Sequence, residues 1–221
     1  WAAQPTMNAL INDVHNAIDP DNPESAGFWK YCIKPSLFLS LINKNLLSSL
    51  VLFRYITAAF GIELDQFKMW SVTQLFALYQ TLYSLPRAFV QYTKQLFRQA
   101  VAFGNRNILG YMYWSRPYRI YICNSAFSYG QFAGTVVHEM AHIFDANADV
   151  QTRWKQQFYK LSSGRYVFTS APPTSYGCTN IKEDIAESVR YYWSDGAAMK
   201  KQCPERYEFI RQYIMQGAEY R

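Results

Sequence analysis

The sequence contains few histidines and no cluster of like charges. Its 221 residues include three histidines, and the 22 Lys and Arg residues against 16 Asp and Glu give a formal net charge of +6. These charges are scattered, and no nucleic-acid-binding motif is present, so we expect no nucleic-acid partner. There is no internal repeat or low-complexity tract, and nothing in the composition is typical of disorder.

The sequence also lacks a long uninterrupted apolar run. Its most apolar stretch, residues 36–60, is broken by Asn43, Lys44, Asn45 and Arg54. A helix that spans a bilayer needs about 20 consecutive, mostly apolar residues. We therefore expect no transmembrane segment, and this chain contains no recognisable targeting segment.

The four cysteines form no C-x-x-C pair, which argues against a structural zinc knuckle. They are Cys32, Cys123, Cys178 and Cys203. An even number is compatible with two disulfides in an exported protein, and four buried thiols are the alternative. We interpret the chain as secreted or exported.

Half of the residues are hydrophobic and 18% are aromatic, which is enough for a sizeable core. Helical spacing of apolar residues predicts helices over 37–53, 66–83 and 87–103. After Gly104, alternation over 118–123 predicts a strand and 124–130 a loop. Further helices are predicted over 131–147, 150–161, 181–193 and 204–216, with a long loop over 162–179 that includes a short strand at 166–169.

These elements predict a predominantly helical α+β fold with a small sheet beside the predicted helix 131–147. We divide the chain into a helical N-terminal region, 1–85, and a second domain, 86–221, to which the motif described next assigns the catalysis. No flexible linker separates the two, so one continuous domain is the alternative.

The sequence His138 to His142 reads H-E-M-A-H. On a helix, positions i and i+4 share one face, so both imidazoles can bind one metal ion. Glu139 is offset around the helix, where its carboxylate can reach a water beside that ion. This is the physical content of the H-E-x-x-H zinc peptidase motif, with Glu139 as the catalytic base.

Neighbouring residues support this interpretation. Val136, Val137, Met140, Ala141, Ile143 and Phe144 are apolar, which predicts that the helix is buried. Buried polar groups need partners, and a metal ion would supply one for the two imidazoles. The remaining histidine, His15, has no comparable partner and is interpreted as a surface or helix-capping residue.

A catalytic zinc ion usually has three protein ligands. Carboxylates downstream are the candidates, and we favour Glu183 because a second helix can approach the ion from another side. Glu187 and Asp145 then orient the ligands. Alternatively, Glu183 forms a capping box with Asn180. We interpret Asp184 as a solvent-facing residue in the first helical turn.

An ordered set of motifs resembles the anthrax lethal factor-like zinc peptidases, including the small secreted Pro-Pro endopeptidases. The matching pieces are H-E-M-A-H-I-F-D (138–145), S-Y-G (175–177), E-D-I-A-E-S-V-R-Y-Y (183–192) and C-P-E-R-Y-E-F-I (203–210). The resemblance implies a zincin-like fold, with His138, His142 and Glu183 as ligands of one zinc ion and Glu139 as general base. It also implies that the Tyr176 hydroxyl stabilises the oxyanion.

The first hundred residues match no part of that family, so cleavage between prolines is not carried over. The segment A-G-T-V-V-H-E (133–139), after R-I-Y-I-C, is also similar to a zinc peptidase group with an aspartate ligand. The G-T-x-x-D motif of that group is absent downstream, which favours Glu183.

We therefore predict a zinc-dependent metalloendopeptidase that acts on a peptide or protein substrate. The alternatives are a hydrolase of cell-wall peptides and a zinc-binding protein without turnover. The strand 119–123 is expected to form the sheet edge, where an extended substrate adds through main-chain hydrogen bonds. A disulfide from Cys178 to Cys203, with Cys32 to Cys123 left over, would fix the loop before Glu183. The oligomeric state is not predicted.

Overall fold

The computed structural model describes residues 47–65 and 69–220, and the chain divides into two compact units, 1–80 and 81–221. His15, Cys32 and the first part of the predicted helix 37–53 lie outside the described residues. Among the helices that are described, none is both long enough and apolar enough to cross a membrane. The predicted mixed α+β class with a small sheet is confirmed.

The first unit contains α4 (Leu47–Phe60), β1 (Glu63–Leu64) and most of α5 (Val72–Ser84). A capping box starts α5, because the Ser71 hydroxyl accepts from the Gln74 N–H and the Gln74 side chain accepts from the Ser71 N–H. Aromatic rings join the two helices: the Tyr79 ring lies 5.9 Å from that of Tyr55 and 6.1 Å from that of Phe60. This unit therefore has its own packed interior.

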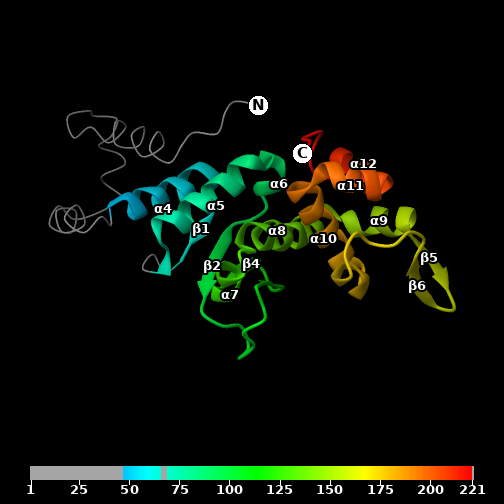
Figure 1. The fold of residues 1–221 in the computed structure, drawn as a ribbon, viewed down its shortest axis with the longest axis horizontal. Coiled ribbons are helices and arrows are strands. Elements are labelled where there is room, and N and C mark those ends of the chain that lie inside the picture. Colours follow the sequence, from blue (N-terminus) through cyan, green and yellow to red (C-terminus); the bar gives the residue numbers. More distant parts are fainter. Residues whose placement is uncertain (1–46, 66–68, 221) are drawn as a thin grey trace. The chain divides into compact units, whose positions relative to one another are not determined.

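In the second unit, three strands lie side by side in the order β2, β4, β3. Of these, β2 and β4 are labelled in Figure 1. They are β2 (Gln95–Gln99), β3 (Gly110–Tyr113) and β4 (Arg119–Cys123). The β2–β4 pair is parallel and the β3–β4 pair is antiparallel. Because β4 is paired on both sides, our expectation that 119–123 forms the sheet edge is wrong; β3 lies at an edge of the sheet.

Helices of the second unit lie beside this sheet and extend away from it (Figure 1). The central helix, α8 (Phe132–Ala148), packs against β3, β4 and α10 (Ile181–Ser194). The other elements of this unit are α6 (Arg87–Val90), α7 (Asn124–Ser128), α9 (Val150–Phe158), the hairpin β5 (Tyr159–Ser162) and β6 (Arg165–Phe168), η2 (Tyr176–Thr179), α11 (Gly196–Gln202) and α12 (Pro204–Tyr213). Buried Ile120, Val137 and Val189 belong to its core.

Local patterns misled the prediction at two helices. The predicted helix 87–103 is only the short α6, after which the chain forms β2, because Leu96 and Arg98 are buried on one face of the sheet. The predicted helix 150–161 ends at Phe158, where the chain turns into β5. In both cases pairing with a distant or later strand outweighs local helical spacing.

Candidate metal centre

The helix α8 presents two histidines one turn apart on its buried face. His138 and His142 are 8% and 6% exposed, and their ring centroids lie 4.8 Å apart. This spacing follows from the i, i+4 geometry of a helix. The helix is held close to the sheet at Gly110, where a Cβ would come within 2.7 Å of the Thr135 methyl group. The two imidazoles are thus fixed on a rigid element.

The first turn of α10 brings the third residue to the same place. The Asn180 side chain caps this helix by accepting from the N–H groups of Lys182 and Glu183. The Glu183 side chain points to α8 instead, with Oε2 3.1 Å from His138 Nε2 and 3.5 Å from His142 Nε2. Asn180 is therefore the N-cap, as the alternative proposed, while the Glu183 carboxylate lies between the histidines.

These three residues fit a metal ion. Their ligand atoms all lie within 4.8 Å of one another. Atoms that bind a tetrahedral zinc ion at about 2.0–2.1 Å lie roughly 3.3 Å apart, close to the two measured distances. Glu183 Oε2 is buried yet has no hydrogen bond of good geometry within the described ranges. A cation between the three groups would satisfy that oxygen, so His138, His142 and Glu183 could hold a metal ion.

Without a cation, the contacts among these groups shift their pKa values in opposite directions. Burial lowers the pKa of His138, but its contacts with Glu183 and Glu187 outweigh burial and raise this pKa to about 9. Burial raises the pKa of Glu183, but the two imidazoles outweigh burial and lower it to about 2. Metal binding at neutral pH must therefore displace a proton from His138.

Glu187 fixes the orientation of the His138 ring. Its Oε1 lies 2.9 Å from His138 Nδ1, so Nδ1 donates to it and Nε2 faces Glu183. Arg190 donates from Nε and NH2 to the two carboxylate oxygens at 2.8 Å, and the Thr174 hydroxyl donates to Oε2 at 2.7 Å. The carboxylate is only 4% exposed, and these partners lower its pKa to about 2. This is the arrangement that tunes histidine ligands in metal sites.

Glu139 lies beside the two histidines and is not part of the ligand group. It is buried at 6% exposure and accepts a hydrogen bond from the Met112 backbone N–H of β3. Burial raises the pKa of its carboxyl, while His138 and His142 act in the opposite direction. A carboxylate with a raised pKa is a better proton acceptor near neutral pH than an exposed one.

A cavity of about 510 Å³ lies beside His138 and Glu139. His138, Glu139 and Tyr176 line it together with Gly110 at the start of β3. The Tyr176 ring centroid lies 6.0 Å from that of His138, and burial together with nearby carboxylates raises the pKa of its hydroxyl. That hydroxyl is therefore a hydrogen-bond donor at neutral pH.

Two groups in our prediction have other roles. Asp145 is buried, but its Oδ1 accepts from the Gln151 N–H at 2.7 Å and so joins α8 to α9. The predicted Cys178–Cys203 disulfide is wrong, because both are free thiols, as is Cys123. Cys178 is exposed on η2 and its Sγ contacts the Thr174 carbonyl, whereas Cys203 precedes α12.

The prediction of a solvent-facing Asp184 is also wrong. Asp184 is 0% exposed and accepts from Trp154 Nε1 at 2.9 Å and from the Tyr159 hydroxyl at 3.0 Å. Arg206, which is 1% exposed, lies 3.1 Å from its Oδ2. This buried ion pair anchors the start of α10, and with it Glu183, to α9 and α12.

Several residues around the site escaped the sequence analysis. Arg190 lies one helical turn after Glu187, a spacing that could have indicated an ion pair. Nothing in the sequence indicates Trp114, whose ring centroid lies 5.9 Å from that of His142. The Lys182 ammonium stands 3.7 Å above the same indole.

No protein-family model, curated protein or solved structure matches this chain, and a function must therefore be argued from the residues of this site.

Proposed function

We propose that this protein is a zinc-dependent metalloendopeptidase in which His138, His142 and Glu183 hold the zinc ion. The observation that carries the proposal is the convergence of three ligand atoms beside a buried carboxylate that is not one of them. Three protein ligands with one open position are typical of catalytic zinc, whereas structural sites have four. When bound, zinc supplies a Lewis acid that polarises a peptide carbonyl and makes water a stronger nucleophile.

Glu139 acts as the general base and then as the general acid. Its carboxylate takes a proton from the attacking water, and the same proton passes to the nitrogen of the leaving amine as the peptide bond breaks. Burial raises the pKa of Glu139, which brings proton uptake closer to neutral pH. The Met112 N–H, which lowers this pKa, lies beside the same carboxylate.

Tyr176 donates a hydrogen bond to the oxygen that becomes negative when the carbonyl is attacked. The residue lies on η2 and lines the same cavity as His138 and Glu139. Its raised pKa keeps the hydroxyl protonated, so it can donate throughout the reaction.

The edge strand β3 is the surface on which we expect an extended peptide to bind. Gly110 belongs to β3 and lines the cavity, and β4 occupies only one side of the strand. The free side offers backbone N–H and C=O groups to a substrate strand. The substrate would thereby pass directly in front of Glu139.

Cleavage of a diverse peptide library by wild type and Glu139→Gln tests this proposal. We expect wild type to cleave and Glu139→Gln to bind the same amount of zinc but lose nearly all turnover. Glu205→Gln, an exposed change of the same kind on α12, is the matched control and should cleave like wild type. Equal turnover by Glu139→Gln and wild type would refute the mechanism. Zinc binding without cleavage of any peptide, but with release of peptides from purified cell wall, would favour a cell-wall hydrolase instead.

A further inference from the structure

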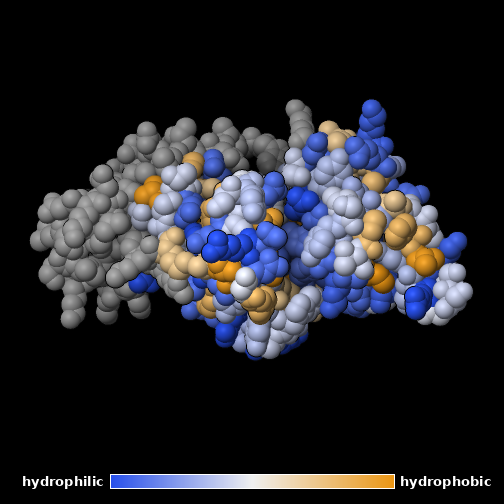
Figure 2. Space-filling view, turned by 60° about the horizontal axis from the view of Figure 1, so that its bottom comes forward, coloured by the Kyte–Doolittle hydropathy of each residue, from blue (hydrophilic) through white to orange (hydrophobic). Residues whose placement is uncertain are grey.

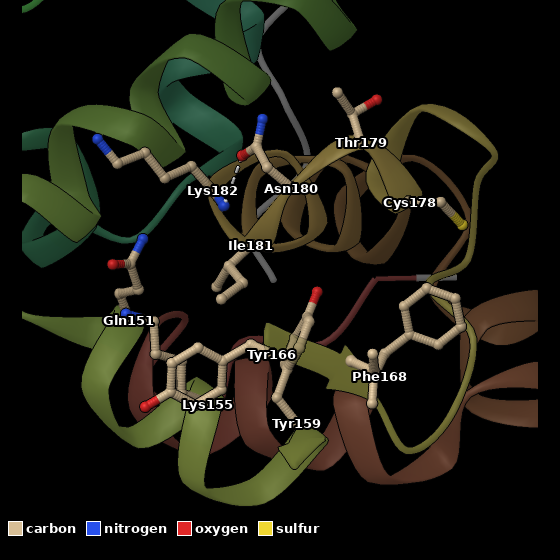
Figure 3. Close-up of a pocket in the computed structure, with 11 residues that line it drawn as sticks. Gln151, Lys155, Tyr159, Tyr166, Phe168, Cys178, Thr179, Asn180, Ile181 and Lys182 are labelled. Carbon is tan, nitrogen blue, oxygen red and sulfur yellow. Dashed lines mark hydrogen bonds between the residues drawn. The ribbon is translucent and has the colours of Figure 1, made fainter. Parts of the chain in front are cut away.

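A second cavity, of about 690 Å³, is lined in part by the residues that precede Glu183 and plays no part in the proposed chemistry. One of its walls is formed by α9 and the hairpin β5–β6, and the other by residues 178–182 (Figure 3). In the close-up, Ile181 projects into the space that the aromatic residues of the hairpin also border. The cavity is open to solvent and could receive a side chain of a bound molecule.

The position of this cavity connects it with the metal group. Residues 178–182 lead directly into Glu183, so the wall and the ligand belong to one continuous segment. The Lys182 ammonium lies over Trp114, and the Trp114 ring lies next to His142. An extended peptide advances about 3.3 Å per residue, so a chain bound at the metal can extend toward this wall.

The hairpin wall is unusually apolar for an exposed surface. Tyr166 and Phe168 are 54% and 41% exposed, and the hairpin strands pair only with each other. Figure 2 shows hydrophobic side chains at the surface toward the end of the unit that carries this hairpin. Exposed apolar groups gathered around a cavity are typical of a binding site.

The charge that this cavity presents is positive. Lys155 and Lys182 belong to its lining, and no carboxylate of the described residues does. The Lys155 ammonium lies 5.3 Å from the centroid of Tyr166, another lining residue, and forms no ion pair with a described residue. The Lys182 ammonium points away from the cavity, over Trp114, and its charge acts on Asp145 (Figure 3). The carboxylate of Asp184 lies behind Tyr159, where Arg206 balances its charge. The Lys155 ammonium therefore complements an anion, and the rings complement an apolar group beside it.

We propose that this cavity is a specificity subsite that binds an Asp or Glu side chain of the peptide substrate together with an adjacent hydrophobic side chain. The assignment of a peptide as occupant rests on the proposed function. The chemistry of the cavity, the Lys155 ammonium among aromatic rings, selects acidic over basic sequences.

Charge reversal at Lys155 tests the subsite by binding, independently of turnover. The probes are blocked tripeptides, Glu-Tyr-Glu and Lys-Tyr-Lys, titrated by NMR into the full-length protein. We expect wild type to prefer the acidic probe and Lys155→Glu to bind it about tenfold more weakly, since attraction becomes repulsion. Lys155→Gln should lose less affinity for the acidic probe. Lys201→Glu changes the net charge by the same amount at an exposed position of α11 and should bind the probes like wild type.

The cleavage library provides the second readout. Wild type should enrich Asp or Glu at one fixed position relative to the cleaved bond, and Lys155→Glu should lose that enrichment. Cleavage without any acidic preference, or equal probe binding by wild type and Lys155→Glu, would overturn the subsite. Charge-dependent binding of the probes without cleavage of any peptide would support the ligand chemistry of the cavity and contradict the peptidase proposal.

Discussion

Replacement of Glu187 by glutamine should weaken zinc binding although Glu187 is not a ligand. The carboxylate accepts four hydrogen bonds: His138 Nδ1 and Arg190 Nε donate to Oε1, and Thr174 and Arg190 NH2 donate to Oε2. At 4% exposure, solvent cannot replace these partners. The network keeps the His138 Nε2 lone pair directed at the metal position.

A glutamine has the same shape but can satisfy only half of this network. If its oxygen takes the place of Oε1, its amino group faces the donors Arg190 NH2 and Thr174. The Thr174 hydroxyl already accepts from the Gly177 N–H, so it is poorly placed to accept a second hydrogen bond. If the amide is flipped, His138 loses its acceptor. Either orientation also leaves the Arg190 charge without its partner.

We expect Glu187→Gln to lower zinc affinity about 10- to 100-fold, or about 1.4–2.7 kcal/mol. Competition with a chromogenic chelator measures this loss directly. Glu208→Gln is the matched control, because Glu208 also pairs with an arginine three residues later, but on an exposed surface. The reasoning is refuted if both variants bind zinc as tightly as wild type, or if Glu208→Gln loses as much affinity as Glu187→Gln.

Three further predictions concern turnover, stability and pH. Tyr176→Phe should keep its zinc but lose about 10²–10³ in kcat, and an unchanged kcat would remove the oxyanion role. Arg206→Met leaves Asp184 buried without its charged partner and should cost about 3–5 kcal/mol in urea unfolding, whereas Arg211→Met, at an exposed pair, should leave the unfolding midpoint nearly unchanged. Without metal, the stability contributed by His138, whose pKa is raised to about 9, is present below pH 6.5 and lost as the pH rises through 9. The stability contributed by Glu183, whose pKa is lowered to about 2, is present above pH 4.5 and lost as the pH falls toward 2. The melting temperature of the metal-free protein, measured as a function of pH, should therefore be highest between pH 4.5 and pH 6.5. A melting temperature that only rises or only falls with pH would contradict this prediction.

The sequence predicted those parts of the site that lie on single helices. The histidines of α8 and the residues of α10 are recognisable because helical spacing decides which side chains share a face. The N-cap Asn180 was recognisable for a similar reason, since capping acts within a few residues. Local rules were sufficient wherever the contacts were local.

Features that depend on distant contacts could not be predicted in the same way. The strand β2 was read as helix because its partner β4 begins about twenty residues later. Asp184 looked like an ordinary first-turn acid, and only the arrival of Trp154 and Arg206 from other helices buries it. Likewise, the sequence does not reveal that Trp114 and Lys182 meet beside His142.

The metal content of the purified wild-type protein, determined by inductively coupled plasma mass spectrometry, tests the central claim most directly. The account predicts one zinc ion per chain, and it predicts that His142→Ala loses this ion, because a ligand of the group is removed. A wild-type chain that retains no zinc, even after incubation with zinc salt and removal of the excess, would contradict the account.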